Sequence, residues 1–141
     1  TLMAQMLGAH PCIHTIKRET GWFIDNTEFE REFNVERNCS ATAGKTLICE
    51  KTPRHVHRAD QIRARFTGAR FIVMTREPTD VVASLKNRIG EFEPAVQRWL
   101  ADSQASLNAL EHADALQVRY EDLVVNPQAE LERICEFLGL P

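Results

Sequence analysis

The sequence places an arginine and a serine on either side of a strand-to-helix turn, at Arg76 and Ser84. The run 70–75 is rich in β-branched and aromatic residues, which is typical of a buried strand, and Pro78 suits the first turn of a helix. Open α/β sheets bind ligands at the carboxyl ends of their strands, where a guanidinium and a helix hydroxyl can bond a phosphate. The pair therefore predicts an anion site. An ion pair between Arg76 and a neighbouring carboxylate is the structural alternative.

A longer pattern surrounds these two residues. Positions 76–84 read Arg-x-Pro-x-Asp-Val-x-x-Ser directly after the apolar run. This resembles the 3′-phosphate-binding motif of sulfotransferases that use 3′-phosphoadenosine-5′-phosphosulfate (PAPS). In that family the arginine and the serine hold the 3′-phosphate of the donor. The resemblance implies the same role for Arg76 and Ser84.

A second match follows another short apolar run, 46–49, which also suits a buried strand. Positions 50–53 read Glu-Lys-Thr-Pro and are similar to a segment of bacterial and carbohydrate-type sulfotransferases. The resemblance implies that Lys51 is the active-site lysine. An ammonium there can stabilise negative charge on the transferring sulfuryl group and the bridging oxygen. A surface lysine at a strand end is the alternative.

A third match lies at the start of the chain, in Thr1-Leu2-Met3, Ala9-His10-Pro11 and Glu19-Thr20. In tyrosylprotein and related bacterial sulfotransferases, an Arg-Ser-Gly-Thr loop runs into such a helix. An Ala-His-Pro turn and a Glu-Thr follow. By this resemblance Thr1 ends the phosphosulfate loop and binds the donor, and Glu19 is the general base that takes the acceptor's proton. A solvated glutamate is the alternative at position 19.

The last match covers the carboxyl-terminal part of the chain. Residues 118–124 and 134–140 resemble the family's Tyr-Glu-Asp-Leu strand end and the helix that follows it. Tyr120 is then expected to line the adenine side of the donor site, since an aromatic ring at a strand end can stack on a base or hydrogen-bond it. A core tyrosine with a capped hydroxyl is the alternative.

The apolar periodicity predicts the elements that must position these residues. It favours helices over 1–8, 28–37, 59–66, 94–110 and 127–138, a helix starting at Pro78, and strands over 46–49, 70–75 and 115–120. The stretch 47–75 reads strand, helix, strand, so its strands should be parallel neighbours, with Lys51 and Arg76 lining one cleft. The predicted fold class is α/β, a parallel sheet flanked by helices. Through the resemblance it is the core shared with P-loop nucleotide kinases, in a single domain 1–141 that we expect to be incomplete at both ends.

Composition and spacing argue against several other classes. A formal net charge of −3 disfavours a general nucleic-acid binder, so any anion site is local. The 4 cysteines form no CxxC pair and no zinc-type spacing, which predicts no metal site. No apolar run approaches the length of a membrane span. Residues 43–46 imitate the end of a triphosphate loop, but Cys39 stands where that loop needs its first glycine.

The matches together predict a sulfotransferase that moves a sulfuryl group from PAPS to a hydroxyl or amine of a small-molecule, carbohydrate or peptide acceptor. A kinase-like phosphotransferase and a non-catalytic nucleotide-binding module on the same scaffold are the rivals. We expect a cytoplasmic location, or the Golgi lumen if an anchor precedes the chain. Because only Thr1 of the phosphosulfate loop is included, residues 1–141 alone are expected to be inactive.

Overall fold

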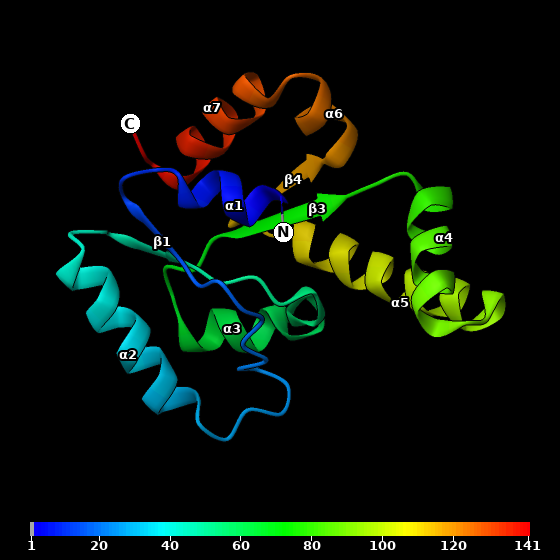
Figure 1. The fold of residues 1–141 in the computed structure, drawn as a ribbon, viewed down its shortest axis with the longest axis horizontal. Coiled ribbons are helices and arrows are strands. Elements are labelled where there is room, and N and C mark those ends of the chain that lie inside the picture. Colours follow the sequence, from blue (N-terminus) through cyan, green and yellow to red (C-terminus); the bar gives the residue numbers. More distant parts are fainter. Residues whose placement is uncertain (1) are drawn as a thin grey trace. The chain divides into compact units, whose positions relative to one another are not determined.

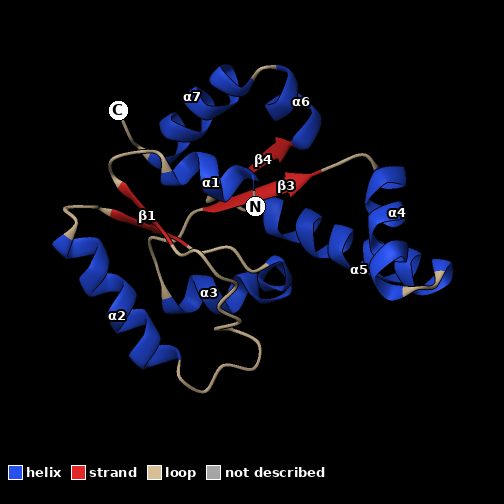
Figure 2. Cartoon of the chain, in the orientation of Figure 1, coloured by secondary structure: helices blue, strands red, loops and turns tan. Residues whose placement is uncertain are grey.

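The computed structural model describes residues 2–141, and the chain forms two compact units that divide between Arg58 and Ala59. Both units contain helices and strands (Figures 1 and 2). The first unit contains α1 (Leu2–Gly8), β1 (Ile13–Thr15), α2 (Phe29–Thr42), β2 (Leu47–Cys49) and the 3₁₀ turn η1 (Pro53–Arg58). The second contains α3 (Ala59–Arg65), β3 (Phe71–Thr75), α4 (Pro78–Ile89), α5 (Phe92–Leu110), β4 (Ala115–Arg119), α6 (Tyr120–Val125) and α7 (Pro127–Leu138).

In the first unit, β1 and β2 form a parallel pair with Ile13 opposite Leu47. The apolar face of α1 is buried, as its spacing predicts, and Leu7 is only 4% exposed. A side chain at Gly8 would place its Cβ 3.0 Å from the Thr15 hydroxyl oxygen, so the close approach of α1 to β1 favours glycine there. This packing supports the strand end from which Lys51 follows.

The helix α2 is amphipathic and largely solvated, in agreement with its sequence pattern. It runs further than predicted, to Thr42, and Ser40 is its one buried residue. Its aromatic side chains Phe29 and Phe33 meet the Trp22 ring edge-on at 5.6 and 5.8 Å between centroids. Aromatic contacts of this kind anchor the loop before α2 without a fully buried helix face.

In the second unit, β3 and β4 run parallel, from Phe71 opposite Ala115 to Thr75 opposite Arg119. Ala59, Val73 and Ala109 form a buried cluster beneath this pair. The last helix has the bounds that the sequence predicts. The Asn126 side chain accepts a hydrogen bond from the Ala129 N–H at its start, and Gly139 ends it with φ of 69°.

The strand pairing differs from the prediction, although the α/β class with parallel strands flanked by helices is confirmed. Within residues 2–141, β2 pairs with β1 and β3 pairs with β4, so β2 and β3 are not ladder neighbours. The apolar pattern of the sequence predicts no strand over 13–15. The helix-containing crossovers between paired strands are β1–α2–β2 and β3–α4–α5–β4.

No helix of the described chain is both long enough and apolar enough to span a membrane.

Candidate functional site

The residues after β2 point alternately to different partners. Lys51 forms an ion pair with Glu19 through its Nζ and the Glu19 Oε1 atom. The Lys51 side chain is 31% exposed and that of Glu19 is 55% exposed, so both are within reach of a substrate. The structure therefore brings together two residues that the sequence analysis took from separate motifs.

The neighbours of Lys51 hold the loop that carries Glu19. The Thr52 hydroxyl oxygen accepts hydrogen bonds from the backbone N–H groups of Thr20 (3.0 Å) and Gly21 (3.3 Å). The same hydroxyl donates to Glu50 Oε1 at 2.6 Å, and the Thr20 hydroxyl donates to that oxygen at 2.9 Å. Gly21 adopts φ of 63°, a conformation that favours glycine. These bonds fix the backbone on the carboxyl side of Glu19.

The Glu50 carboxylate receives a further bond from a buried histidine. His55, 8% exposed, lies with Nδ1 at 2.8 Å from Glu50 Oε2, and its Nε2 accepts the Phe23 N–H at 3.4 Å. Because Nε2 accepts, the ring proton lies on Nδ1 and is donated to Glu50. Burial by itself would raise the pKa of Glu50, but the hydrogen bonds from His55 and Thr52 outweigh it and lower that pKa. The carboxylate is therefore held ionised as a structural acceptor.

The second cluster lies at the carboxyl ends of β3 and β4. The Arg76 guanidinium lies 4.7 Å from the centroid of the Tyr120 ring. Its Nε and Nη2 atoms donate to Asp80 Oδ2 at 3.2 and 2.6 Å, so the ion pair that the sequence left open is formed. Ser84 is exposed on α4, four residues after Asp80, and residues so spaced share a helix face.

A small cavity of about 140 Å³ opens beside Arg76, at the same edge of the strand pair. It is lined by Thr75, Arg76, Glu77, Pro78, Arg119 and Glu121. Arg76 and Arg119 give this cavity the donors that an anion needs, beside the carboxylates of Glu77 and Glu121, and its size suits one phosphate group better than a nucleotide. The residues present therefore fit the phosphate end of a nucleotide donor.

Arg119 was absent from the candidates drawn from the sequence. It ends β4, where the β3–β4 register sets it opposite Thr75. Its guanidinium is 3.8 Å from Asp122 and 4.0 Å from Glu121, and more than half of its side chain is exposed. The sequence places Arg119 near the end of a predicted strand. That position indicates an anion site only when the partner strand, and therefore the neighbouring Arg76, is known.

Glu121 ties this cavity to the start of α4. Its Oε1 atom accepts the Glu77 N–H at 2.9 Å. That hydrogen bond, with the nearby arginines, lowers the pKa of the Glu121 carboxyl. The bond joins the first turn of α6 to the segment that carries Arg76.

Two other residues, Thr1 and Tyr120, are expected from the sequence to bind the donor. Thr1 lies outside the described residues. Tyr120 begins α6 rather than ending a strand, and Arg76 covers one face of its ring. Among residues 2–141, no three His, Cys, Asp or Glu side chains come together as a set of metal ligands.

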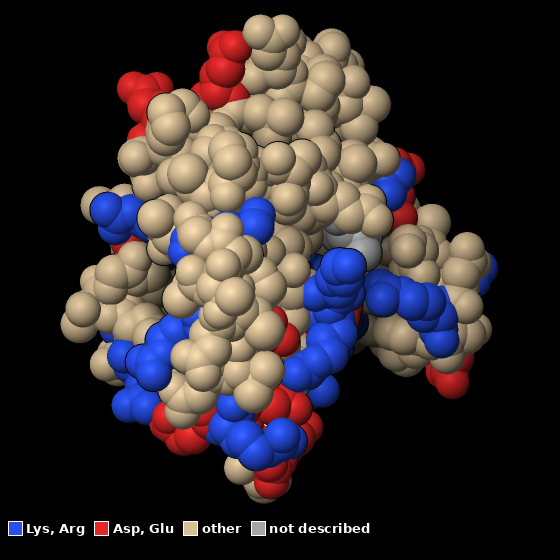
Figure 3. Space-filling view, turned by 60° about the vertical axis from the view of Figure 1, so that its left-hand side comes forward, with Lys and Arg blue, Asp and Glu red and all other residues tan. Residues whose placement is uncertain are grey.

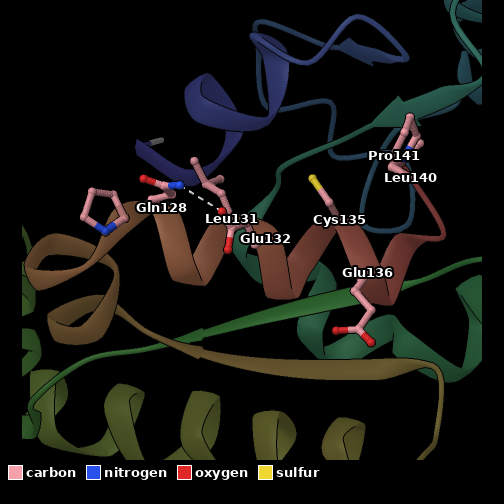
Figure 4. A pocket seen from close by; sticks show the side chains of 8 residues that line it. Gln128, Leu131, Glu132, Cys135, Glu136, Leu140 and Pro141 are labelled. Carbon is pink, nitrogen blue, oxygen red and sulfur yellow. Dashed lines mark hydrogen bonds between the residues drawn. The ribbon is translucent and has the colours of Figure 1, made fainter.

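A larger open groove of about 650 Å³ runs along α7 (Figure 4). Leu131, Cys135, Leu140 and Pro141 give it apolar walls, and Glu132 and Glu136 are its charged residues. Gln128 donates to Glu132 at 2.9 Å across its rim. Because its charged groups are acidic, this groove does not suit a phosphate or sulfate group.

On the face drawn in Figure 3, Lys and Arg side chains have Asp and Glu among them. This agrees with a net charge of −3 and with anion binding at local clusters.

Comparison with known proteins gives a consistent result. The model of the sulfotransferase family matches residues 16–141. Protein-tyrosine sulfotransferase A of Caenorhabditis elegans is 29% identical over 105 residues, which are 67% of this chain and 28% of that protein. Nodulation protein NoeE of Sinorhizobium fredii is 30% identical over 127 residues, covering 70% of this chain and 30% of that protein. The chain thus spans less than a third of the length of these relatives.

Two solved structures are similar in fold. A sulfotransferase domain from the curacin biosynthetic pathway has a TM-score of 0.67 and 26% identity, and the match covers 80% of this chain and 44% of that one. A sulfotransferase from Alicyclobacillus acidocaldarius has a TM-score of 0.61 and 15% identity, over 96% of this chain and 74% of that one. The second likeness is one of fold alone.

Proposed function

The chain belongs to the sulfotransferase family, and we propose that it contributes the catalytic and 3′-phosphate-binding residues of a PAPS-dependent transfer to a hydroxyl or amine. The observation that carries the proposal is the ion pair between Glu19 and Lys51. Each residue was assigned from its own motif, and the fold brings the two side chains into contact. A carboxylate and an ammonium in contact are the base and the charge-stabilising group that such a transfer needs.

Each proposed residue has one task. Glu19 accepts the proton of the acceptor's hydroxyl or amine, and Lys51 places its ammonium where negative charge develops. Arg76, Arg119 and Ser84 bind the 3′-phosphate. When bound, PAPS supplies the sulfuryl group: sulfur bonds to the acceptor atom, and the old S–O bond breaks with its electron pair left on 3′-phosphoadenosine-5′-phosphate (PAP).

The rigid support behind Glu19 matters for this function. The bonds from Thr52 to the Thr20 and Gly21 N–H groups hold the loop, while the Glu19 side chain itself bonds only outward to Lys51 among the contacts described. A base on a fixed backbone with a movable side chain can meet an acceptor proton at hydrogen-bond distance.

The test is transfer of label from ³⁵S-PAPS by the full-length protein to a panel of phenols, sugars and tyrosine peptides, without added metal. Glu19→Gln should lower kcat by about a hundredfold to ten-thousandfold, as expected for loss of a general base. Glu28→Gln is the matched control, since Glu28 is also an exposed carboxylate in an ion pair, with Arg31. It should leave kcat unchanged.

Two results would refute the proposal. Label transfer from γ-³²P-ATP with magnesium but none from PAPS would identify a kinase instead. If the protein binds PAP tightly but transfers label to no acceptor, and Glu19→Gln binds PAP equally well, the protein is a nucleotide-binding module.

A further inference from the structure

The first turn of α6 holds two consecutive residues of the β3–α4 connection. Tyr120 places its ring under the Arg76 guanidinium, 4.7 Å from centroid to Cζ. The next residue, Glu121, accepts the Glu77 N–H at 2.9 Å. The side chain of Arg76 and the backbone beside it are thus fixed from one helical turn.

That turn is itself rigidly anchored. Val118 and Leu123, on either side of Tyr120 in the sequence, are 0% and 1% exposed. Buried residues in native packing leave little freedom to the backbone between them. The backbone that carries the Tyr120 ring is therefore held in place, whereas a free arginine side chain has several rotatable bonds to order.

Asp80 fixes the rotation of the same guanidinium. Both Nε and Nη2 of Arg76 donate to Asp80 Oδ2. These two atoms form one edge of the planar guanidinium, so the edge made by Nη1 and Nη2 remains directed elsewhere. Phosphate oxygens can accept paired bonds from such an edge. The contacts of Arg76 are those of a residue prepared for a ligand.

We propose that Tyr120 and Asp80 are positioning residues that hold Arg76 ready for a nucleotide phosphate, and that Tyr120 acts on the donor through Arg76 rather than by stacking on the adenine. The proposal rests on the function proposed above in one respect, that the phosphate is the 3′-phosphate of PAPS. It differs from the role that sequence resemblance suggested for the tyrosine, because one face of the Tyr120 ring is covered by the Arg76 cation.

Binding of PAP and of AMP, measured by calorimetry on the full-length protein, separates the two roles. Tyr120→Leu should weaken PAP binding about threefold to tenfold and leave AMP binding unchanged, because AMP lacks the 3′-phosphate. Tyr120→Phe retains the ring and should bind PAP within about twofold of the wild type. In an Arg76→Ala background, Tyr120→Leu should have no further effect.

Asp80→Asn should likewise weaken PAP binding only while Arg76 is present. Asp102→Asn is its matched control, because Asp102 also pairs with an arginine four residues away on the same helix, Arg98. It should not change binding. Tighter PAP binding by Asp80→Asn would show that Asp80 competes with the phosphate. If Tyr120→Leu weakened PAP and AMP binding equally, the ring would act by stacking on the adenine. Either result overturns the proposal for that residue.

A measurement without nucleotide keeps this test separate from that of the proposed function. The Arg76 Nε–H resonance, assigned by its loss in Arg76→Lys, should be shifted by the Tyr120 ring in the wild type and in Tyr120→Phe. It should move towards the free-arginine position in Tyr120→Leu. If the resonance behaves so but PAP fails to bind, the donor assignment is wrong and the positioning stands. An unshifted resonance in the wild type refutes the positioning itself.

Discussion

Side chains alternate in direction along residues 50–52, so this short segment both holds the loop that carries Glu19 and supplies the proposed active-site lysine. Lys51 reaches Glu19, whereas Glu50 and Thr52 bond the loop that carries Glu19. Successive side chains in an extended segment point to opposite sides, so a single strand end can serve two surfaces. The supporting residues are as specific as the reactive ones, because their oxygens match particular N–H and O–H groups.

Thr52 should therefore be important for stability. Thr52→Val keeps the shape but removes the acceptor that the Thr20 and Gly21 N–H groups share and one of the donors to Glu50 Oε1. We expect the free energy of unfolding to fall by about 1–3 kcal/mol, the usual effect of unsatisfied buried polar groups. Urea denaturation at neutral pH measures this change.

Two further variants control that experiment. Thr52→Ser keeps the hydroxyl and should recover most of the stability. Thr46→Val changes an exposed threonine just before β2 and should alter the unfolding free energy by less than about 0.5 kcal/mol. Equal stability of Thr52→Val and the wild type would show that the hydroxyl does not hold the loop.

At the residue scale, the sequence was sufficient to identify site residues that stand in a local motif. It was insufficient for residues whose place in the site depends on strand pairing. Arg76 and Lys51 were found because each stands in a recognisable segment after an apolar run. Arg119 was missed because its place beside Arg76 follows from the β3–β4 register. The Arg76 contact with Tyr120 was missed for the same reason, since their sequence separation is large and only the strand pairing makes them neighbours.

At the scale of elements, long periodic segments were predictable and short polar ones were not. Amphipathic spacing identified α5 and α7. The strand β1 has three residues, two of them polar, and so shows no alternation that distinguishes it from a loop. Without β1, the strand that follows β2 along the chain was taken as its neighbour, whereas β2 pairs with β1 and β3 pairs with β4.

Glu32 joins α2 to the preceding loop and should make that junction sensitive to acid. Hydrogen bonds from Trp22 and Asn26, with Arg18 nearby, lower the pKa of Glu32 from 4.5 to about 2. A carboxyl whose pKa is lower when folded stabilises the fold fully above pH 4.5, and this stabilisation is lost as the pH falls towards 2. We expect the difference in unfolding free energy between wild type and Glu32→Gln to be largest at neutral pH and to shrink below pH 4.5.

Urea midpoints measured from pH 7 downwards, with Glu32→Gln beside the wild type, check this dependence. Other carboxylates titrate equally in both proteins, so the difference isolates Glu32. A difference that stays constant, or grows as the pH falls, would contradict the assigned direction.

In the second unit, Arg63 joins α3 to the segment between α5 and β4. Its Nε and Nη2 atoms donate to the two Asp114 carboxylate oxygens, each at 2.9 Å, and Nη2 also donates to the Ala109 carbonyl. The guanidinium also lies 4.5 Å from the centroid of the Phe71 ring. A lysine keeps the charge but not this fork, so Arg63→Lys should reduce the unfolding free energy by about 1–3 kcal/mol.

The matched control for that change is Arg98→Lys. Arg98 makes an ion pair with Asp102 on the surface of α5. A partly exposed single ion pair of this kind should change stability by less than about 1 kcal/mol. If both lysine variants unfold at the same urea concentration, the fork geometry of Arg63 is not what stabilises α3 against β4.

At the scale of the whole molecule, the two compact units carry different parts of the proposed chemistry. Glu19 and Lys51 lie in the unit that ends at Arg58, and Arg76 and Arg119 lie in the unit that begins at Ala59. PAP contains the phosphates but not the sulfuryl group. Its affinity should therefore report on the second unit, and the rate of the chemical step should report on the first.

This separation gives a prediction for four variants of the full-length protein. Arg76→Ala and Arg119→Ala should raise the Kd for PAP by about tenfold or more, since a bond between charged groups contributes about 1.5–3 kcal/mol. Their single-turnover rates at saturating PAPS should stay within a few-fold of the wild type, because the 3′-phosphate is bound equally in the ground and transition states. Glu19→Gln and Lys51→Ala should show the reverse, a PAP affinity within about twofold and a single-turnover rate at least about a hundredfold lower. Calorimetry and rapid-quench assays measure the two quantities, with Arg98→Ala as a control for the loss of a surface arginine. If Lys51→Ala weakens PAP binding while the rate at saturation is kept, Lys51 binds the nucleotide phosphates and is not the group that stabilises the transferring sulfuryl charge.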